Sequence, residues 1–599
     1  MGGWQNKVLR INLSNKKIST EGLNNNWVKS FLGGRGLGVK YLFEELPEKT
    51  DPFSADNKLI FVTGPLTGTY GAANGRYMVV TKSPLNNFIT SSNSGGYFPS
   101  ELKYAGYDMI IIEGKSERPV YIAIYNDKVE IRGATNIWGK TTFETEEIIK
   151  REFHNDAKIA CIGPAGEKQV LFSCIINDKY RAAGRSGVGA VMGSKNLKAI
   201  AVRGTGGVKI SDKNAFRKAA QVTYSLIKKS PVTAEGLPKY GTAVLVNIIH
   251  ESGLMPVNNF LREYIENVEN ISGERIAETI LKRNKACMSC IIGCGRVAVV
   301  RGEKEVIGEG PEYEPIWSMG ADCGITDLDA ITKANYICNA YGIDPISAGG
   351  TIACAMEMFE KGIITEKDTG MPLNFGNSDA MVKMIEAICK REGFGDVLAL
   401  GSTRLSEKYG SPEISMGVKK LEFPAYDGRV AQGIGLNYAT SNRGACHVRG
   451  YTISPEILGV PEKFDPVETQ GKAELVKTFQ DVTAVVDSVG MCLFTTFALT
   501  INEIKDLFNA ATGLSYNVDD MLHIGERIWN LERLFNLREG LNPEEDTLPK
   551  RLLETPVSEG PNKGLTSRLD ILLPEYYKVR GWNKDGLIEK ETLQKLNLM

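Results

Sequence analysis

The residues of this chain that could most readily do chemistry are three closely spaced cysteines. Cys287, Cys290 and Cys294 form a C-x2-C-x3-C window. Thiolates this close can converge on one cluster, and a cubane iron–sulfur cluster takes four of them. Structural zinc sites usually consist of two separated Cys/His pairs, and the sequence has no second C-x2-C. The window therefore favours an iron–sulfur cluster over zinc or three unrelated buried thiols.

The fourth cluster ligand must lie outside the window. Spacing alone does not choose among five candidates, which are Cys323, Cys338, Cys354, Cys446 and Cys492. A cluster of this kind predicts a redox protein, and other residues must indicate which redox reaction it serves.

Glycine-rich loops beside arginines form a second candidate site. The segment Gly184–Lys195 matches neither G-x-G-x-x-G nor the P-loop pattern, so it does not predict a nucleotide loop. Arg181 and Arg185 next to it, and Arg35 in Gly33–Gly38, could hold phosphates together with backbone N–H groups. A set of tight turns accounts for the same glycines equally well.

Four further polar residues could line a pocket, although each alone is more often structural. Arg76 and Asn93 stand beside small residues, which suits a pocket for a large polar ligand. Glu314 follows a Gly-Pro turn, where carboxylates are usually solvated. His447 is one of only four histidines, and a lone histidine is more often hydrogen-bonded structure than an acid–base group.

Composition limits the class of protein. The chain has 599 residues, 42% hydrophobic and 24% charged, with a net charge of −1. This predicts a globular protein of three or four domain-sized units, with no surface for nucleic acid or membrane. The eleven cysteines follow no pairing pattern, and there is no signal-peptide pattern or long apolar run. We therefore expect a cytoplasmic protein in a reducing compartment.

The elements that must position these residues change character along the chain. The first two hundred residues or so are rich in strand patterns, and a Gly-Thr-Gly-Gly boundary follows at 204–207. The predicted strands are 58–63, 77–81, 108–113, 119–125, 128–132 and 197–203, with a tight hairpin turn at Asn126-Asp127.

The rest of the chain is predicted to be mainly helical. Helical periodicity marks 212–229, 276–285, 329–341, 347–361, 473–486 and 520–537. Thr326 is the expected N-cap of 329–341, and Gly342 follows its end. A second boundary is placed near 415. The predicted domains are thus 1–208, 209–415 and 416–599.

These pieces together resemble the tungsten-dependent aldehyde:ferredoxin oxidoreductase family nearly end to end. The likeness is carried by the cysteine window and by the segments 63–68, 75–77, 93–96, 181–185, 187–200, 309–314, 442–447, 487–492 and 574–582. The resemblance implies an α+β fold, in which an N-terminal β-rich pterin-binding domain is followed by two mainly α-helical domains that enclose the cofactor. Among these segments are Arg-Ala-Ala-Gly-Arg at 181–185 and Asn-Arg-Gly-Ala-Cys-His at 442–447.

The resemblance also implies a cofactor set. One tungsten, or less often molybdenum, would be held by the dithiolene sulfurs of two pyranopterins, beside a [4Fe-4S] cluster. Magnesium would bridge the pterin phosphates, bound by Asn93 and the backbone carbonyl near Ala182. The residues implied on the phosphate side are Arg76, Gly95, Arg181, Gly184 and Arg185.

In the family, two D-x-x-G-L-(C/D) segments bind the pterins. The second matches here as Asp487, Gly490, Met491 and Cys492, which makes Cys492 the implied fourth cluster ligand. Arg443 and Arg449 match family positions near this pterin.

The first pterin segment departs from the family pattern. It matches as Asn339, Gly342, Ile343 and Asp344, with Asn in place of the family's Asp. An amide carries no charge and donates as well as accepts hydrogen bonds. Contacts to that pterin, or the redox poise of the cofactor, are therefore expected to differ from those of family members with Asp at this position.

The activity implied is oxidation of aldehydes to carboxylic acids with water, with electrons passing to ferredoxin or a small iron–sulfur subunit. Glu314 would be the base, with a pKa raised by burial. His447, and Tyr313 as a second donor, would stabilise charge developing on oxygen. No Glu-x-x-His tetrapeptide exists, so the family's intersubunit iron bridge is expected to be absent and the oligomeric state is open.

Two other functions are compatible with parts of the same pattern. One is a tungsten-containing subunit that reduces aromatic thioesters. The other is a non-catalytic iron–sulfur subunit for electron transfer that has lost its pterin. The joint presence of Glu314 and His447 favours aldehyde oxidation over the first, and the intact loops at 75–96 and 181–200 argue against the second.

Overall fold

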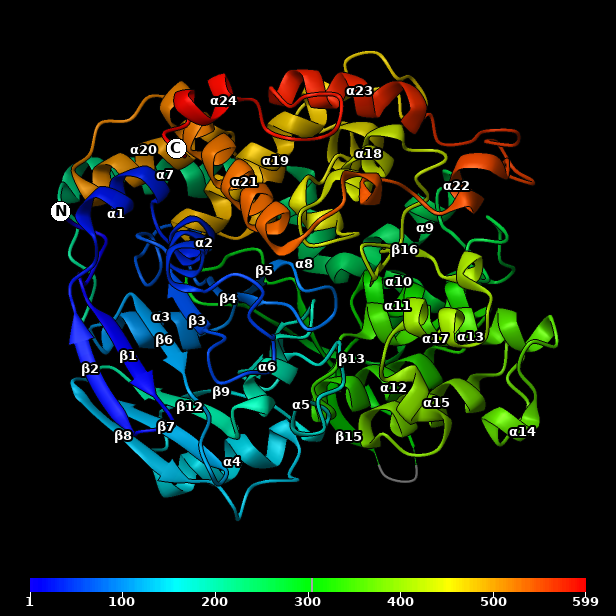
Figure 1. Ribbon diagram of the computed structural model, residues 1–599, viewed down its shortest axis with the longest axis horizontal. Coiled ribbons are helices and arrows are strands. Elements are labelled where there is room, and N and C mark those ends of the chain that lie inside the picture. Colours follow the sequence, from blue (N-terminus) through cyan, green and yellow to red (C-terminus); the bar gives the residue numbers. More distant parts are fainter. Residues whose placement is uncertain (303–304) are drawn as a thin grey trace.

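The N-terminal third is built on two six-stranded sheets. The computed structural model describes residues 1–302 and 305–599 (Figure 1). In the first sheet the order is β2 (Lys17–Glu21), β1 (Val8–Asn12), β6 (Met109–Glu113), β3 (Leu59–Thr63), β4 (Tyr77–Lys82) and β5 (Ile89–Ser94). The central strands are runs of Ile, Val and Leu that are buried on both faces, as strands covered on both sides require.

The second sheet lies beside the first. Its order is β11 (Arg181–Ala183), β10 (Ile175–Asn177), β9 (Lys158–Cys161), β12 (Leu197–Arg203), β7 (Val120–Tyr125) and β8 (Lys128–Gly133). The edge strands β5 and β11 of the two sheets meet. The side chain of Asn177 fixes this junction, because it donates to the carbonyl of Gly95 at 2.8 Å and accepts from Ser94 at 2.8 Å.

A buried helix joins the first sheet to the C-terminal helices. Helix α2 (Gly34–Glu45) packs between strands β3 and β4 on one side and helices α19 (Lys472–Val489) and α21 (Val518–Glu539) on the other. A Cβ at Gly38 would lie 2.7 Å from Val80 Cγ2, and one at Gly36 would lie 2.6 Å from Ile528 Cδ1. The glycines of 33–38 therefore permit close helix packing.

After residue 212 the chain is mainly helical (green to red in Figure 1). The longer helices there are α7 (Lys213–Lys229), α12 (Leu328–Tyr341), α13 (Pro345–Glu360), α15 (Ser378–Lys390), α18 (Gln432–Thr440), α19, α20 (Ile501–Thr512), α21 and α23 (Leu569–Arg580). Shorter ones are α8 (Leu237–Tyr240), α9 (Leu245–Glu251), α10 (Gly273–Thr279), α11 (Tyr313–Met319), α14 (Glu366–Thr369), α16 (Phe394–Leu398), α17 (Ser402–Lys408), α22 (Lys550–Glu554) and α24 (Lys590–Lys595). Among the helices of the described residues, none is long and apolar enough to cross a membrane.

The β-rich N-terminal region also carries helices, and a third sheet interrupts the helical part. The N-terminal helices besides α2 are α1 (Asn25–Phe31), α3 (Phe98–Tyr104), α4 (Thr142–Glu152), α5 (Pro164–Glu167) and α6 (Val188–Ser194). The third sheet has the order β13 (Leu281–Lys285), β14 (Gly295–Val300) and β15 (Val306–Glu309), and a short pair, β16 (Gly417–Val418) and β17 (Leu421–Glu422), follows later. The α+β fold class is confirmed, while the domain boundaries 1–208, 209–415 and 416–599 stay predictions.

Two local predictions were wrong. The helix expected over 276–285 ends at Thr279, and residues 281–285 form the edge strand β13 paired with β14. Periodic apolar residues such as Ile276 and Ile280 do face the core, but residues 281–285 pair with β14 across the loop that carries the cysteines, and this pairing overrides the helical pattern. The cap of α12 is Asp327, whose side chain accepts from two backbone N–H groups, and not Thr326.

Candidate active site

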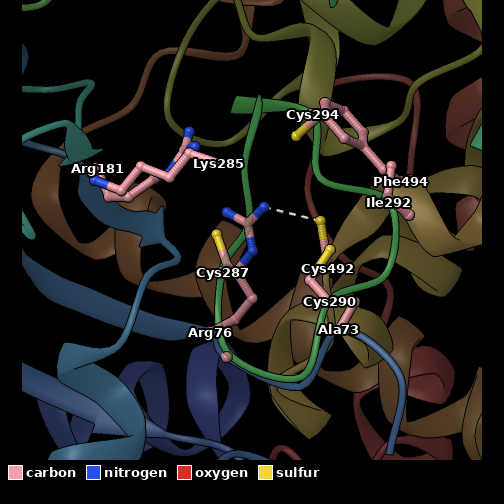
Figure 2. Close-up of a pocket in the computed structure, with 11 residues that line it drawn as sticks. Ala73, Arg76, Arg181, Lys285, Cys287, Cys290, Ile292, Cys294, Cys492 and Phe494 are labelled. Atoms are coloured by element: carbon pink, nitrogen blue, oxygen red, sulfur yellow. Dashed lines mark hydrogen bonds between the residues drawn. The ribbon is translucent and has the colours of Figure 1, made fainter. Parts of the chain in front are cut away.

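The three window cysteines and Cys492 surround one small cavity (Figure 2). The window lies in the loop from β13 to β14, and Cys492 precedes the 3-10 helix η8 (Leu493–Phe497). A segment of the N-terminal region ties them together: Ala73 donates its N–H to the carbonyl of Ser289 at 2.8 Å and accepts from the N–H of Cys492 at 3.1 Å. The structure therefore brings Cys492 to the window, as the resemblance implied.

The other candidates for a fourth ligand lie elsewhere. Cys323 and Cys354 are buried in the core, and Cys446 accepts a hydrogen bond from Arg443 at 2.8 Å. Among the described residues, no three His, Cys, Asp or Glu side chains converge on a single metal ion. Four thiols around one cavity match the number that a cubane iron–sulfur cluster takes.

A buried guanidinium holds the window in place. Arg296 in β14 is 2% exposed, and every hydrogen bond it makes is to a backbone carbonyl. The carbonyls are those of Gly293 and Cys294 in the window and of Leu237, Pro238 and Lys239 in α8. Because these acceptors would otherwise be unpaired near the protein interior, Arg296 fixes the position of the third cysteine.

A larger cavity of about 360 Å³ adjoins the cysteines and holds most of the predicted site residues. It is lined by Cys287, Cys294 and Cys492 at one end and by Glu314 and His447 elsewhere. Five guanidinium groups face it, from Arg76, Arg181, Arg185, Arg443 and Arg449. The remaining predicted residues on its lining are Asn93, Gly95, Ala182, Gly184, Tyr313, Asn339, Ile343, Asp344 and Asp487.

Arg76 stands between the two cavities. It donates to Cys492 Sγ at 2.8 Å (dashed in Figure 2) and to Asn93 Oδ1 at 3.1 Å. Asn93 in turn donates to Asp487 Oδ1 at 3.0 Å, and Arg449 donates to Asp487 Oδ2 at 2.8 Å. One hydrogen-bonded chain therefore links a predicted cluster ligand to the predicted second pterin motif.

The other arginines are held by carboxylates or carbonyls. Arg181 lies 3.0 Å from Glu309 and 3.2 Å from Glu312. Arg185 donates to Asp344 at 3.1 Å. Arg35, by contrast, lines neither cavity and forms a bidentate pair with Glu532 at 2.7 Å. The possibility that Arg35 holds a phosphate directly is therefore not supported.

The two predicted pterin motifs each follow a helix that ends in a left-handed glycine. Gly342 (φ 77°) ends α12, and Gly490 (φ 88°) ends α19. At Gly490 a Cβ would lie 2.2 Å from Thr67 Oγ1, so this turn requires glycine. Met491 is fully buried and is not among the residues that line the larger cavity, and its contact with a pterin stays a prediction.

Glu314 and His447 face each other. Glu314 lies in the first turn of α11, and its Oε1 lies 3.5 Å from His447 Nε2. Each side chain keeps 14% of its surface exposed, toward the cavity that both line. Among the described residues, neither Glu314 Oε1 nor His447 Nδ1 has a hydrogen-bond partner. These free polar atoms are available to a ligand.

Burial keeps this pair uncharged. It raises the pKa of Glu314 to about 8. Burial, with the guanidinium groups of Arg185 and Arg443, lowers the pKa of His447 well below its ordinary range. Near neutral pH the contact is thus between a carboxylic acid and a neutral imidazole, not an ion pair. The raised pKa expected of Glu314 is what a group exchanging protons near neutral pH needs.

Tyrosines close the cavity beside this pair. Tyr426 and Tyr451 share a hydrogen bond of 2.9 Å between their hydroxyls, and their rings lie 5.9 and 6.0 Å from the imidazole of His447. Tyr313 donates its hydroxyl to the carbonyl of Ala425 at 3.1 Å. Its proton is therefore already engaged, which does not favour the predicted role as a second donor.

Comparison with known proteins places this site in a family. The family model described as aldehyde ferredoxin oxidoreductase, N-terminal domain, matches residues 8–204, and that described as aldehyde ferredoxin oxidoreductase, domains 2 & 3, matches 218–598. The chain belongs to the aldehyde ferredoxin oxidoreductase family. The resemblance seen in the sequence is confirmed, and so is the prediction of an enzyme.

Relatives within the aldehyde ferredoxin oxidoreductase family are similar over their full length. Tungsten-containing aldehyde ferredoxin oxidoreductases of Pyrococcus abyssi and Pyrococcus furiosus are 53% and 54% identical, each covering 100% of this chain and 99% of the relative. An aliphatic sulfonate oxidoreductase, WOR-like subunit, of Pyrococcus furiosus is 31% identical, covering 100% of this chain and 97% of the relative. A chain of the active-site complex BamBC of benzoyl coenzyme A reductase with 1,5-dienoyl-CoA has a TM-score of 0.86 at 26% identity, covering 100% of this chain and 97% of that chain.

The cavity has hydrogen-bond donors and space for a large anionic group. Five guanidinium groups around one space of about 360 Å³ would pair with phosphates. Arg443 Nε has no hydrogen-bond partner among the described residues. At Gly184 a Cβ would meet only Ala182 Cβ, at 4.0 Å, so the backbone there leaves room for a ligand. The donors and the space thus fit a polyphosphorylated group.

Sequence reasoning missed several residues of the site. Glu309, Tyr426 and Tyr451 line the cavity, and Arg296 holds the window. Glu309 stands in the Glu-Gly-Pro-Glu run and could have been singled out beside Glu312. No sequence signal marks the tyrosines, because only the fold brings them next to His447.

Proposed function

We propose that this enzyme oxidises aldehydes to carboxylic acids and passes the electrons through a [4Fe-4S] cluster to a ferredoxin or a small iron–sulfur subunit. The balanced reaction is aldehyde and water to carboxylic acid, two electrons and two protons. The observation that carries the proposal is the neutral Glu314–His447 contact, which lines the same cavity as three of the four convergent cysteines. Relatives named as aldehyde ferredoxin oxidoreductases support it.

The cofactor proposed for the cavity is a tungsten, or molybdenum, bis-pyranopterin with magnesium between its phosphates. When bound, it supplies the centre that accepts the electron pair removed from the aldehyde. Arg76, Arg181, Arg185, Arg443 and Arg449 would pair with its phosphates and ring edges. Asn93 and the carbonyl of Ala182 would bind magnesium through oxygen, the ligand this ion prefers.

The protein's own groups would manage the protons. In its ionised form, Glu314 would take a proton from the water that adds to the carbonyl carbon, and its raised pKa makes it a strong enough base. Neutral His447 would donate a hydrogen bond to the aldehyde oxygen as charge develops there. The tyrosines around the imidazole would exclude bulk water and position the aldehyde.

Replacing Glu314 with Gln tests the proposal. The amide keeps the size of the side chain but cannot take a proton, so we expect kcat to fall by about 10²–10⁴-fold. Metal and iron content, measured by mass spectrometry on protein purified without oxygen, should stay at the wild-type level. Unchanged turnover with full metal content would remove Glu314 from the mechanism.

One alternative rests on a specific observation, the likeness to the benzoyl coenzyme A reductase complex. Reduction of an aromatic thioester would use the same cavity. Greater identity to the aldehyde ferredoxin oxidoreductases, 53% against 26%, favours aldehyde oxidation. An assay of the holoenzyme with benzoyl-CoA and a low-potential reductant separates the two, because only the alternative predicts a dienoyl product.

A further inference from the structure

The loop that carries the window cysteines reaches solvent at Ile291, which is 40% exposed. Cys287, Cys290 and Cys294 are half-buried, whereas Cys492 is only 7% exposed. Between residues 281 and 294, Ile292 alone is buried. Because the rate of electron tunnelling falls steeply with distance, a carrier must dock where cluster ligands approach the surface. The window is that place.

Exposed apolar side chains surround the window. Tyr70 is 48%, Tyr97 is 38% and Ile291 is 40% exposed. The carbonyl preceding Tyr97 accepts the N–H of Met288 at 3.1 Å, and the carbonyl preceding Tyr70 accepts the hydroxyl of Ser289 at 3.1 Å. Since Met288 and Ser289 belong to the window, the three apolar side chains lie around it. Exposed apolar groups gathered in this way are typical of interaction sites.

The segments around this centre lack acidic residues, and two of them are cationic. Residues 64–76, 213–229, 281–294 and 491–500 contain no Asp or Glu, although the whole chain has 72 acidic and 71 basic residues. Helix α7 and strand β13 supply exposed basic side chains to these segments. They are Lys213, Arg217, Lys218, Lys228, Lys229, Lys282 and Arg283.

Helix α7 is fixed against the apolar centre. Tyr224 in α7 donates its hydroxyl to the carbonyl of Tyr70 at 3.1 Å, and Phe216 packs edge-on to the ring of Tyr70 with centroids 4.8 Å apart. Strand β13 leads directly into the window. The cations of both elements therefore flank the same apolar centre.

Acidic groups do lie near the window and α7, and several have partners. Glu312 pairs with Arg181 at 3.2 Å, and Asp506 of α20, which packs against α7, pairs with Lys505 at 3.1 Å. The carboxylate of Asp178 accepts the N–H groups of Tyr97 and Phe98. Glu235 and Glu274 lie near Lys239, beyond β13, and balance that lysine. Within α7 and β13 the exposed charged side chains are all basic.

We propose that this window surface, with Tyr70, Tyr97 and Ile291 at its centre and the cations of α7 and β13 at its edges, docks an acidic iron–sulfur electron carrier. The inference rests on the proposed function, which needs a one-electron acceptor for the cluster. Small apolar contact areas with charge complementarity suit transient electron-transfer complexes, in which charge mainly raises the association rate. The carrier accepts one electron per encounter, so two encounters complete one oxidation.

The test compares charge-reversal variants of the holoenzyme with two acceptors. One variant is Lys282→Glu with Arg283→Glu in β13, and the second is Arg217→Glu with Lys218→Glu in α7. The matched control is Lys367→Glu in α14 with Lys383→Glu in α15, two helices at the lower right of Figure 1, whereas α7 lies at the upper left. The acceptors are an acidic bacterial-type ferredoxin and the small dye benzyl viologen.

We expect the KM for ferredoxin to rise about tenfold or more in both window variants at low salt. This difference should shrink at high salt, where exposed charges are screened. Activity with benzyl viologen should stay within about twofold of wild type, because a small dye needs no docking surface. The control variant should behave as wild type with both acceptors. An unchanged ferredoxin KM in both window variants would overturn the proposal.

Binding of ferredoxin to the holoenzyme by calorimetry separates this inference from the proposed function. If aldehydes give no reduction of benzyl viologen, the proposed function fails, and loss of ferredoxin binding in the window variants alone still supports the docking site. Sedimentation of the wild type and the variants tests whether a second copy of the chain occupies this surface instead. A dimer that dissociates in the window variants would mean that a second copy of the chain covers this surface, and would overturn the proposal.

Discussion

The two ends of the large cavity differ in their exposure to water. At one end, Glu314 and His447 are uncharged because burial raises the pKa of the acid and lowers that of the imidazole. At the other end, the loop of the window cysteines reaches the surface at Ile291, and Arg76 contacts Cys492 at 2.8 Å. The comparison teaches that proton chemistry requires exclusion of water, whereas electron transfer requires access to a partner.

The two ends also differ in how they are held. Arg296 fixes the window through backbone carbonyls, so its shape depends on the path of the chain. The Glu314–His447 contact depends on side chains, and Glu314 Oε2 accepts the N–H of Ala425 at 3.1 Å. Changes at the window should therefore affect the cluster. Changes at Glu314 or His447 should affect proton transfer and leave the metal content unaltered.

Replacing Cys492 with Ser should give the largest effect. A cubane cluster needs four thiolates, so we expect the iron content to fall and activity with every acceptor to drop by at least about 100-fold. The matched control is Cys354→Ser, another buried cysteine that lies in the core and is not among the lining residues of either cavity. Iron analysis and electron paramagnetic resonance of the reduced protein check the result. Full iron content and an unchanged spectrum in the Cys492→Ser variant would contradict the assignment of Cys492 as a cluster ligand.

The pH dependence of activity should report on Glu314 and not on the cysteine window. Because Glu314 has a pKa of about 8 and acts as a base when ionised, kcat/KM should rise with pH through this range. Folding raises this pKa above its ordinary value of 4.5, so the folded state holds a proton that the unfolded state has lost between these values. This contribution to stability is therefore lost as pH rises from 4.5 to about 8.

The matched comparison for pH is the Glu314→Gln variant. Its residual activity should lack the rise, and its Tm should fall less than that of wild type over the same range of pH. A wild-type profile that is flat from about pH 6 to about pH 9 would mean that Glu314 does not titrate during turnover.

The smallest effect is expected for Asn339→Asp. Asn339 lies in the last turn of α12 and donates to the carbonyl of Asn335 at 3.0 Å. An aspartate loses this donor and places a negative charge at a helix C-terminus, which together cost about 1–2 kcal/mol of unfolding free energy. Denaturant unfolding of the variant and the wild type measures this change in the free energy of unfolding. An increase in stability would show that this part of the cavity favours a carboxylate.

Much of the fold could be predicted from the sequence where patterns are local. The strands expected at 58–63 and 77–81 are β3 and β4, and the helix expected at 520–537 is α21. The edge strand β13 could not be predicted, because its pairing with β14 competes with a helical pattern that ends at Ile280. Local periodicity carries no information about a partner strand.

The candidate site was predictable only in part, for the same reason. The spacing of the window marked three cysteines, but the residues alone left five candidates for the fourth, and only the resemblance pointed to Cys492. The contact of Glu314 with His447 joins α11 to the short helical turn η6 (His447–Arg449). The tyrosines Tyr426 and Tyr451 carry no spacing signal, since their role depends on the packing around that turn.

The contacts of Ala73 have a consequence for how the protein matures. This residue links a loop of the N-terminal region to the window and to Cys492, which come from three distant parts of the chain. A cluster bound to the four thiols would clamp these parts together and add its binding energy to the folding energy. Cluster insertion would then be the step that closes the molecule, and a chain without its cluster would be the form most open to proteases and to delivery of the second cofactor.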